Sequence, residues 1–90
     1  MVEALYNRGN ALCQLKRTEE ALSSYDHAIP IRPDHVMALN NRGWVLQLMK
    51  RYDEALASYE RALAIKPDFK ATIANRWRLL QEMKRSVSAP

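Results

Sequence analysis

Residues 5–33 read LYNRGNALCQLKRTEEALSSYDHAIPIRP, and residues 39–67 read LNNRGWVLQLMKRYDEALASYERALAIKP. The two stretches are copies of one unit, because aligning residues 2–35 with 36–69 without gaps pairs 18 identical residues in 34. A third copy, half a unit long, begins at Lys70. Self-similarity at one fixed period is typical of a repeat architecture, in which each unit packs mainly on its neighbours.

Each unit has the pattern of two helices. Apolar and small residues recur at intervals of three and four, which is the spacing of one helix face. Between the two runs lie KRTEE in the first unit and KRYDE in the second, so basic residues follow one helix and acidic residues open the next, as the helix dipole favours. The sequence therefore predicts an all-α fold of five antiparallel helices at roughly 3–16, 19–31, 36–50, 53–66 and 70–85.

Proline and aspartate mark the end of each unit. Pro33, which recurs at the same place in the second unit, is expected to stop the second helix. Asp34 is expected to cap the following helix through its side-chain oxygen. Pro30 has Ala64 as its counterpart, so the second helix of the first unit is expected to end or bend one turn early.

Both glycines of the chain, Gly9 and Gly43, fall inside predicted helices at the same position of the unit. Glycine in a helix costs about 1 kcal/mol relative to alanine, so its repetition indicates a packing requirement. We expect each glycine to let the first helix approach the small face of the second helix, which consists of Ala21 and Ala28 or of Ala55 and Ala62.

Taken together, these features resemble the tetratricopeptide repeat family, whose unit is a helix–turn–helix of 34 residues. The family pattern of small residues, an aromatic residue and a closing proline is met by Gly9, Ala21, Tyr25, Ala28 and Pro33, and again by Gly43, Ala55, Tyr59, Ala62 and Pro67. One departure is that Leu5 and Leu39 replace an early aromatic residue. The resemblance implies a right-handed α-α superhelix and a single domain over 1–90, with units 2–35 and 36–69, a capping half-unit 70–85 and a tail 86–90.

The resemblance also implies a function. The family is a class of protein-binding scaffolds, and partners are expected on the concave face lined by the first helix of each unit. The residues expected there are Tyr6, Asn7, Asn10, Asn40, Asn41, Trp44, Asn75 and Arg78. Asn7, Asn41 and Asn75 form a ladder at period 34. Two interpretations are open: the amides bind a peptide backbone, because an amide both donates and accepts, or they join neighbouring helices.

One family activity, the clamping of a peptide's terminal carboxylate, is not expected. Asn10 and Asn41 match the two asparagines of that clamp. However, Tyr6, Ala71 and Asn75 stand where the clamp has basic residues.

Other function classes find no support in the residues. No catalytic constellation or phosphate-binding loop can be argued, so we expect a non-enzyme without cofactor or metal. His27 and His35 are expected at the surface, and Cys13 is expected to be small filler on a helix. Without an apolar run of about 20 residues or a signal-peptide pattern, a cytoplasmic location is the default expectation.

Charge is uneven along the chain. Residues 1–69 hold nine basic and nine acidic residues, so the net charge of +4 comes from residues 70–90. This indicates either a solvated cap or a surface for an acidic partner, with nucleic acid or an anionic membrane as lesser alternatives. Arg8, Arg42 and Arg76 recur at period 34 and are expected to pair with Glu20 or Glu54, or with a carboxylate of an adjacent unit.

Trp77 occupies the position that glycine has in the first two units. The third copy lacks a second helix, so the need for a small residue disappears there. Two outcomes are open: Trp77 folds down as a lid over the second unit, or it stays exposed and a second copy of the chain covers it. In the second case Ile73, Trp77 and Leu80 would form the surface of a homodimer.

Overall fold

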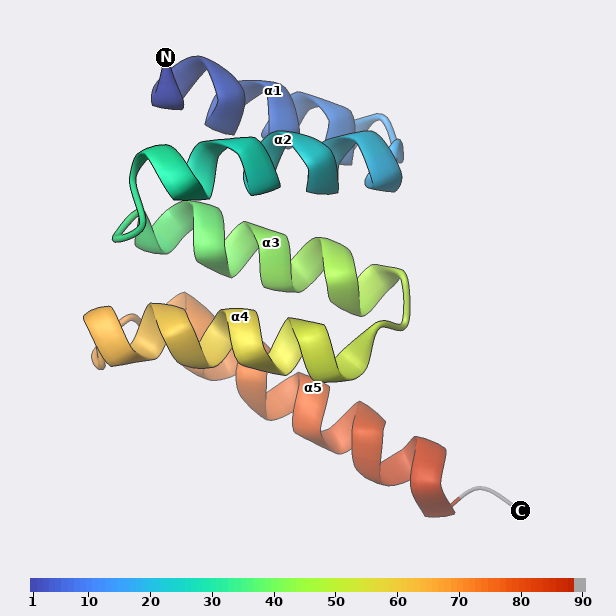
Figure 1. Cartoon of the computed structure of the whole chain (residues 1–90). Coiled ribbons are helices and arrows are strands. Elements are labelled where there is room, and N and C mark those ends of the chain that lie inside the picture. The colour runs from blue at the N-terminus through green and yellow to red at the C-terminus, as the bar shows by residue number, and fades with distance from the viewer. Residues whose placement is uncertain (89–90) are drawn as a thin grey trace.

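The chain, seen here as a computed structural model that describes residues 1–88, is a row of five helices (Figure 1). They are α1 (Val2–Gln14), α2 (Thr18–Ile31), α3 (Val36–Leu48), α4 (Tyr52–Ile65) and α5 (Lys70–Ser88). The predicted all-α fold is therefore confirmed. The last helix runs three residues beyond the predicted position 85, while Ala89 and Pro90 of the predicted tail lie outside the described residues.

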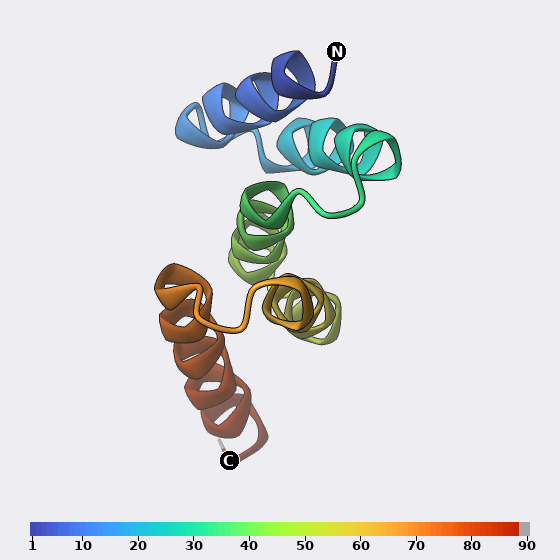
Figure 2. The ribbon, with the colours of Figure 1, turned by 90° about the vertical axis from the view of Figure 1, so that its left-hand side faces the viewer.

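The helices form two layers. In the view of Figure 2, α1, α3 and α5 lie on one side and α2 and α4 on the other. The most extensive packing is within a unit, between α1 and α2 and between α3 and α4, and each second helix also packs on the first helix of the next unit. One layer of the molecule thus consists of the first helices, as the repeat predicts.

Lysine ends the first helix of both full units. The helices α1 and α3 stop two residues before the predicted ends because Lys16 and Lys50 take the left-handed conformation, with φ of 62° and 61°. In the first turn, Lys16 N donates to Cys13 O and Arg17 N donates to Leu12 O, at 3.0 and 2.9 Å. These two bonds make a Schellman cap, in which glycine is the usual left-handed residue.

The two glycines lie beneath tyrosine rings. A Cβ on Gly9 would stand 2.6 Å from Cε1 of Tyr25, and one on Gly43 would stand 2.5 Å from Cε1 of Tyr59. The prediction that the glycines face the alanines of the second helix is wrong, because the nearest atoms belong to a tyrosine ring. Each glycine makes room for the aromatic ring of its own unit's second helix, and both rings are fully buried.

The core runs along the seam between the two layers. Leu39, Leu46, Ala55, Tyr59 and Ala62 are fully buried in the second unit. The capping helix α5 contributes Thr72 and Leu79, which are also fully buried and which the sequence pattern did not single out. They lie 34 residues after Ala38 and Val45, so α5 packs on α4 with the same face that α3 turns to α2.

Two expectations about single residues at helix ends, for Pro30 and Asp34, are wrong. The helix α2 ends at Ile31, the counterpart of Ile65 in α4, so the early end expected at Pro30 is wrong. Proline here removes only one bond of the last turn, and the bond from Arg32 N to Ala28 O is kept at 3.1 Å. The helix α3 is capped by His35, not by Asp34, because Nδ1 of His35 accepts from Ala38 N at 3.2 Å.

Candidate functional site

The layer of first helices carries the eight residues expected to bind a partner, which we call the first-helix surface. Its members are Tyr6, Asn7 and Asn10 of α1, Asn40, Asn41 and Trp44 of α3, and Asn75 and Arg78 of α5. Of these, Asn7, Trp44 and Arg78 are exposed, four are partly buried and Asn40 is buried. The helices therefore place these side chains on one layer, with differing access to solvent.

Asparagine amides join α3 to α1 within this surface. Asn41 Nδ2 donates to Asn10 Oδ1 at 2.9 Å and lies 3.4 Å from the hydroxyl of Tyr6. The buried hydroxyl of Tyr25, on α2, donates to the same Oδ1 of Asn10. One amide oxygen thus receives donors from two other helices.

A matching set of bonds joins α5 to α3. Oδ1 of Asn40 accepts from Asn75 Nδ2 at 3.1 Å and from Thr72 Oγ1 at 2.8 Å. Asn40 Nδ2 lies 3.3 Å from Oδ1 of Asn41, which links this set to the first one. Asn41 and Asn75 therefore both bond to the preceding first helix. These bonds favour the interpretation that the asparagine ladder joins neighbouring units. Asn7, on α1, is exposed.

A third polar link lies at the other end of α3. Tyr59 OH donates to Gln47 Oε1 at 2.8 Å, and Gln47 Nε2 donates to Glu82 Oε1 at 2.6 Å. Burial raises the pKa of Tyr25 and of Tyr59 well above its ordinary value, so both hydroxyls stay protonated as donors. The sequence pattern did not predict this chain of bonds, since it depends on the distance across three helices.

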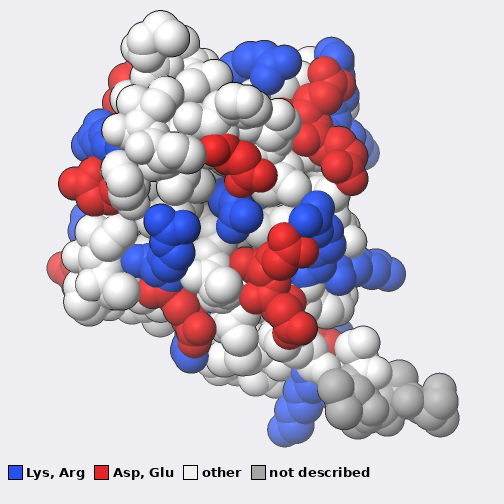
Figure 3. Space-filling model, viewed as in Figure 1, with Lys and Arg blue, Asp and Glu red and all other residues white. Residues whose placement is uncertain are grey.

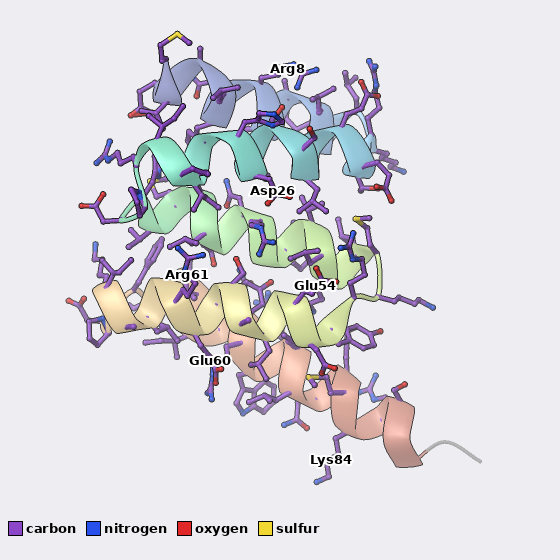
Figure 4. All side chains as sticks on the ribbon, in the orientation of Figure 1. Arg8, Asp26, Glu54, Glu60, Arg61 and Lys84 are labelled. Atoms are coloured by element: carbon purple, nitrogen blue, oxygen red, sulfur yellow. The ribbon has the colours of Figure 1, made fainter. Side chains whose placement is uncertain are left out.

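The arginine ladder ties each unit to the one before it. Arg42 Nε lies 2.6 Å from Oδ1 of Asp26, and Arg76 Nη2 lies 3.1 Å from Oε2 of Glu60. In Figure 4, Asp26 lies on the side of α2 that faces α3, and Glu60 on the side of α4 towards α5. The prediction of pairing with an adjacent unit is therefore confirmed for these two arginines, while Arg8 donates to Ser24 of its own unit.

Glu20 and Glu54, the other partners considered, pair across the turn that precedes them. Arg17 makes a two-point bond to Glu20, with both distances 2.7 Å, and Arg51 does the same to Glu54 at 2.9 and 2.8 Å. These hydrogen bonds hold the pKa of each carboxyl below its ordinary value. On the face shown in Figure 3, basic and acidic side chains accordingly lie next to one another.

The predicted surface position of His35 is wrong, since its side chain is only 7% exposed. Its ring packs on Tyr6, with centroids 4.7 Å apart, because Nδ1 caps α3 and draws the imidazole under the first-helix surface. Nε2 lies 3.7 Å from Oε1 of Glu3, beyond hydrogen-bond distance. His27 is exposed as predicted. Cys13 is partly buried, and that burial raises the pKa of its thiol, in keeping with its predicted role as filler.

The helix α5 has an exposed apolar face. Trp77 is 63% exposed and Ile73 46%, while Leu80 is partly buried. Of the two outcomes considered for Trp77, the lid over the second unit is therefore wrong, because Thr72 and Leu79 already pack there from the adjacent face of the helix. A hollow of about 440 Å³ opens beside Trp77, lined by Lys70, Ile73, Ala74, Trp77 and Arg78.

No group of three or more His, Cys, Asp or Glu residues in 1–88 is placed to hold a metal ion. None of the five described helices is long and apolar enough to cross a membrane.

Known proteins resemble the chain in both sequence pattern and fold. The solved structure "First TPR of Spaghetti (RPAP3) bound to HSP90 peptide SRMEEVD" superposes with a TM-score of 0.90 at 23% identity, over 93% of this chain and 67% of the other. The Arabidopsis OM64 TPR domain superposes with a TM-score of 0.86 at 27% identity, over 90% of this chain and 67% of the other. No curated protein sequence matches the chain. The family model described as tetratricopeptide repeat matches residues 1–68. This chain belongs to the tetratricopeptide repeat family.

Proposed function

We propose that the chain is a non-catalytic interaction scaffold that binds a peptide or partner protein on its first-helix surface. The observation that carries the proposal is that one residue from each first helix on this surface is exposed, namely Asn7, Trp44 and Arg78. Membership of a repeat family built for protein interaction supports it. A similar solved structure holds a bound peptide, which supports the same class of partner.

The bonds between the first helices explain how this surface would work. Asn41 and Asn75 fix α3 and α5 against the preceding first helix, so the three exposed side chains are held on a rigid base. A surface that is ordered before binding loses less conformational entropy when a ligand arrives. Trp44 offers a large apolar ring, Arg78 a cation and Asn7 both a donor and an acceptor. The proposed ligand is therefore an extended segment that carries an apolar side chain and a carboxylate or carbonyl group.

The mode of binding is expected to differ from a carboxylate clamp. The positions that would need basic residues are held by Tyr6, Ala71 and Asn75. Asn10 and Asn41, the two asparagines that match, are bonded to each other at 2.9 Å. A peptide that depends on its terminal carboxylate would therefore find few charged partners here.

The test begins with a peptide selected from a random displayed library against the whole chain. Its affinity is then measured by fluorescence anisotropy for Trp44→Ala, Asn7→Ala and a control, Arg61→Ala, which removes an exposed side chain of α4. We expect Trp44→Ala to weaken binding by about tenfold or more, as for a central aromatic contact, and the control to change it little. Equal affinity of Trp44→Ala and the unmodified chain would count against this surface.

The exposure of Trp77 and Ile73 supports a second candidate, self-association through α5. Sedimentation velocity over a range of concentrations tests it directly. A dimer that is lost in Trp77→Ala supports self-association, and a monomer at every concentration rejects it.

A further inference from the structure

The repeat identifies what kind of partner α5 lacks. Ile73, Trp77 and Leu80 lie 34 residues after Leu39, Gly43 and Leu46, which are all buried in the second unit. That face of α3 is covered by α4: the hydroxyl of Ser58 bonds to Leu39 O, and the ring of Tyr59 lies on Gly43. The exposed face of α5 is therefore the one that binds a helix in each full unit.

Trp77 excludes a helix of the type found in the units. A single Cβ at Gly43 would already stand 2.5 Å from the Tyr59 ring, so an indole at the same position leaves no room for a tyrosine-bearing helix at that distance. A helix could lie on α5 only at a wider separation, with its own side chains filling the space beside the indole. The face thus suits a different helix from α2 or α4.

Two hollows open beside this face. One, of about 440 Å³, is lined by Lys70, Ile73, Ala74, Trp77 and Arg78, and the other, of about 320 Å³, by Trp77, Arg78, Gln81, Glu82 and Arg85. The two hollows share Trp77 and Arg78. From Lys70 to Arg85 the helix rises by roughly 22 Å, which is the length of about four helical turns. We call this surface the α5 groove.

The border of the α5 groove is positively charged. Lys70, Arg78 and Arg85 line its two hollows. Its one lining carboxylate, Glu82, accepts a bond from Gln47 at 2.6 Å, and Arg76 is paired with Glu60 outside the groove. Apolar side chains bordered by cations are complementary to a helix that carries carboxylates beside its apolar stripe.

We propose that the α5 groove binds an amphipathic, acidic helical segment of another protein. Bulky apolar residues of that segment would pack on Ile73 and Trp77, and its carboxylates would pair with Lys70, Arg78 and Arg85. A second copy of the chain fits less well, since apposing two α5 helices would bring these cations against the cations of the other copy. The proposal does not depend on the first-helix surface, although Arg78 borders both.

The chain's two tryptophans, Trp44 and Trp77, allow the two surfaces to be read separately. In Trp44→Phe, the remaining indole reports on the α5 groove; in Trp77→Phe, it reports on the first-helix surface. The probe is a synthetic helix of about four turns, roughly 22 Å long, with leucines on one side and glutamates on the other. We expect this probe to shift the emission of Trp44→Phe to shorter wavelength with a saturable titration, and to bind more weakly as salt is raised.

Charge variants and a matched probe sharpen the test. A probe with lysine in place of glutamate should bind at least about tenfold more weakly. Lys70→Glu and Arg85→Glu should each weaken the acidic probe by several fold, whereas Arg61→Glu, the same charge change on α4, should weaken it much less. Circular dichroism checks that the variants keep their helix content.

Three results would overturn the proposal. The first is a shift seen only in Trp77→Phe, which would place the acidic probe on the first-helix surface and leave the proposed function intact. The second is a dimer, detected by sedimentation, that Trp77→Ala dissociates. The third is equal binding of the acidic and the lysine probe.

Discussion

At the scale of single residues, close approach between helices explains why glycine recurs at one position of both full units. Gly9 and Gly43 sit under the rings of Tyr25 and Tyr59, with no space for a Cβ. The tyrosine hydroxyls reach on to Asn10 and Gln47, which belong to the network joining the first helices. Each pair therefore links the packing within a unit to the polar bonds of the first-helix layer.

Gly43→Ala tests this packing. Overpacking by the added methyl should lower the free energy of unfolding by about 1–3 kcal/mol. The better helix propensity of alanine offsets about 1 kcal/mol of this loss. We expect a lower urea midpoint, because the Tyr59 ring is fully buried and cannot move aside freely. In a Tyr59→Leu background the same alanine should be neutral or stabilising, and a destabilisation of equal size in both backgrounds would contradict the clash.

The buried tyrosines also predict a loss of stability in alkali. Burial raises the pKa of Tyr25 and Tyr59 in the folded state, whereas in the unfolded chain each titrates near 10. Above about pH 10 the unfolded state loses protons that the folded state keeps, so the free energy of unfolding falls as pH rises. Urea melts at rising pH should show this fall, and a Tyr25→Phe variant, although weaker at neutral pH, should show a shallower one. An identical slope for both chains would argue against it.

At the scale of helices, the sequence defines the elements well and their caps poorly. The 34-residue period predicts five helices and their order because apolar spacing reports directly which face is buried. The caps depend on single residues outside that spacing: Lys16 and Lys50 take the left-handed position where glycine is usual, and His35 caps α3 in place of Asp34. The apolar spacing distinguishes none of these choices.

Lys50→Gly tests the cap of α3. Glycine adopts φ of 61° without the strain of a Cβ, so the free energy of unfolding should rise by a few tenths to about 1 kcal/mol. Lys66, which ends α4 with φ of −133°, provides the control. There glycine relieves no strain and should leave stability unchanged or lower it. A gain of the same size at both positions would show that φ is not the cause.

At the scale of the whole molecule, polar seams hold the units in register. The amide bonds join α1, α3 and α5 on one layer, and the Arg42–Asp26 and Arg76–Glu60 pairs join α2 to α3 and α4 to α5. The arginine pairing could be predicted from the repeat, since charge and period suggested it. The direction of the amide bonds could not, because asparagine at a repeated position is compatible with binding a ligand or a neighbour.

Asn41→Ala and Arg42→Ala compare the two seams. The amide of Asn41 donates to Oδ1 of Asn10, a partly buried acceptor that also accepts a bond from the Tyr25 hydroxyl. Losing the Asn41 amide should therefore lower the free energy of unfolding by about 1–3 kcal/mol. The Asp26 carboxylate is about half exposed, so losing its arginine should cost about 1 kcal/mol or less. Chemical melts of both variants show which substitution costs more stability. A larger loss of unfolding free energy in Arg42→Ala would mean that the arginine pairs, and not the amide bonds, contribute more to holding the units together.

The exposed end of α5 is a property of the whole array as well. The same face is buried in both full units, so its exposure follows from the absence of a second helix after α5 in the described chain. Sequence alone left two outcomes for Trp77, because periodicity gives the face of a side chain but not what covers it. The structure shows that the indole of Trp77 is exposed. The cations that border it motivate the acidic partner proposed above.

The most direct test of the proposed scaffold function is an NMR titration of the nitrogen-15-labelled chain with the peptide selected from the displayed library. The indole N–H signals of Trp44 and Trp77 are resolved from the backbone and report on the two surfaces separately. Binding on the first-helix surface predicts saturable shifts of the Trp44 indole and of the Asn7 and Arg78 backbone amides. Shifts confined to the exposed sides of α2 and α4, with the Trp44 indole unmoved, would contradict it.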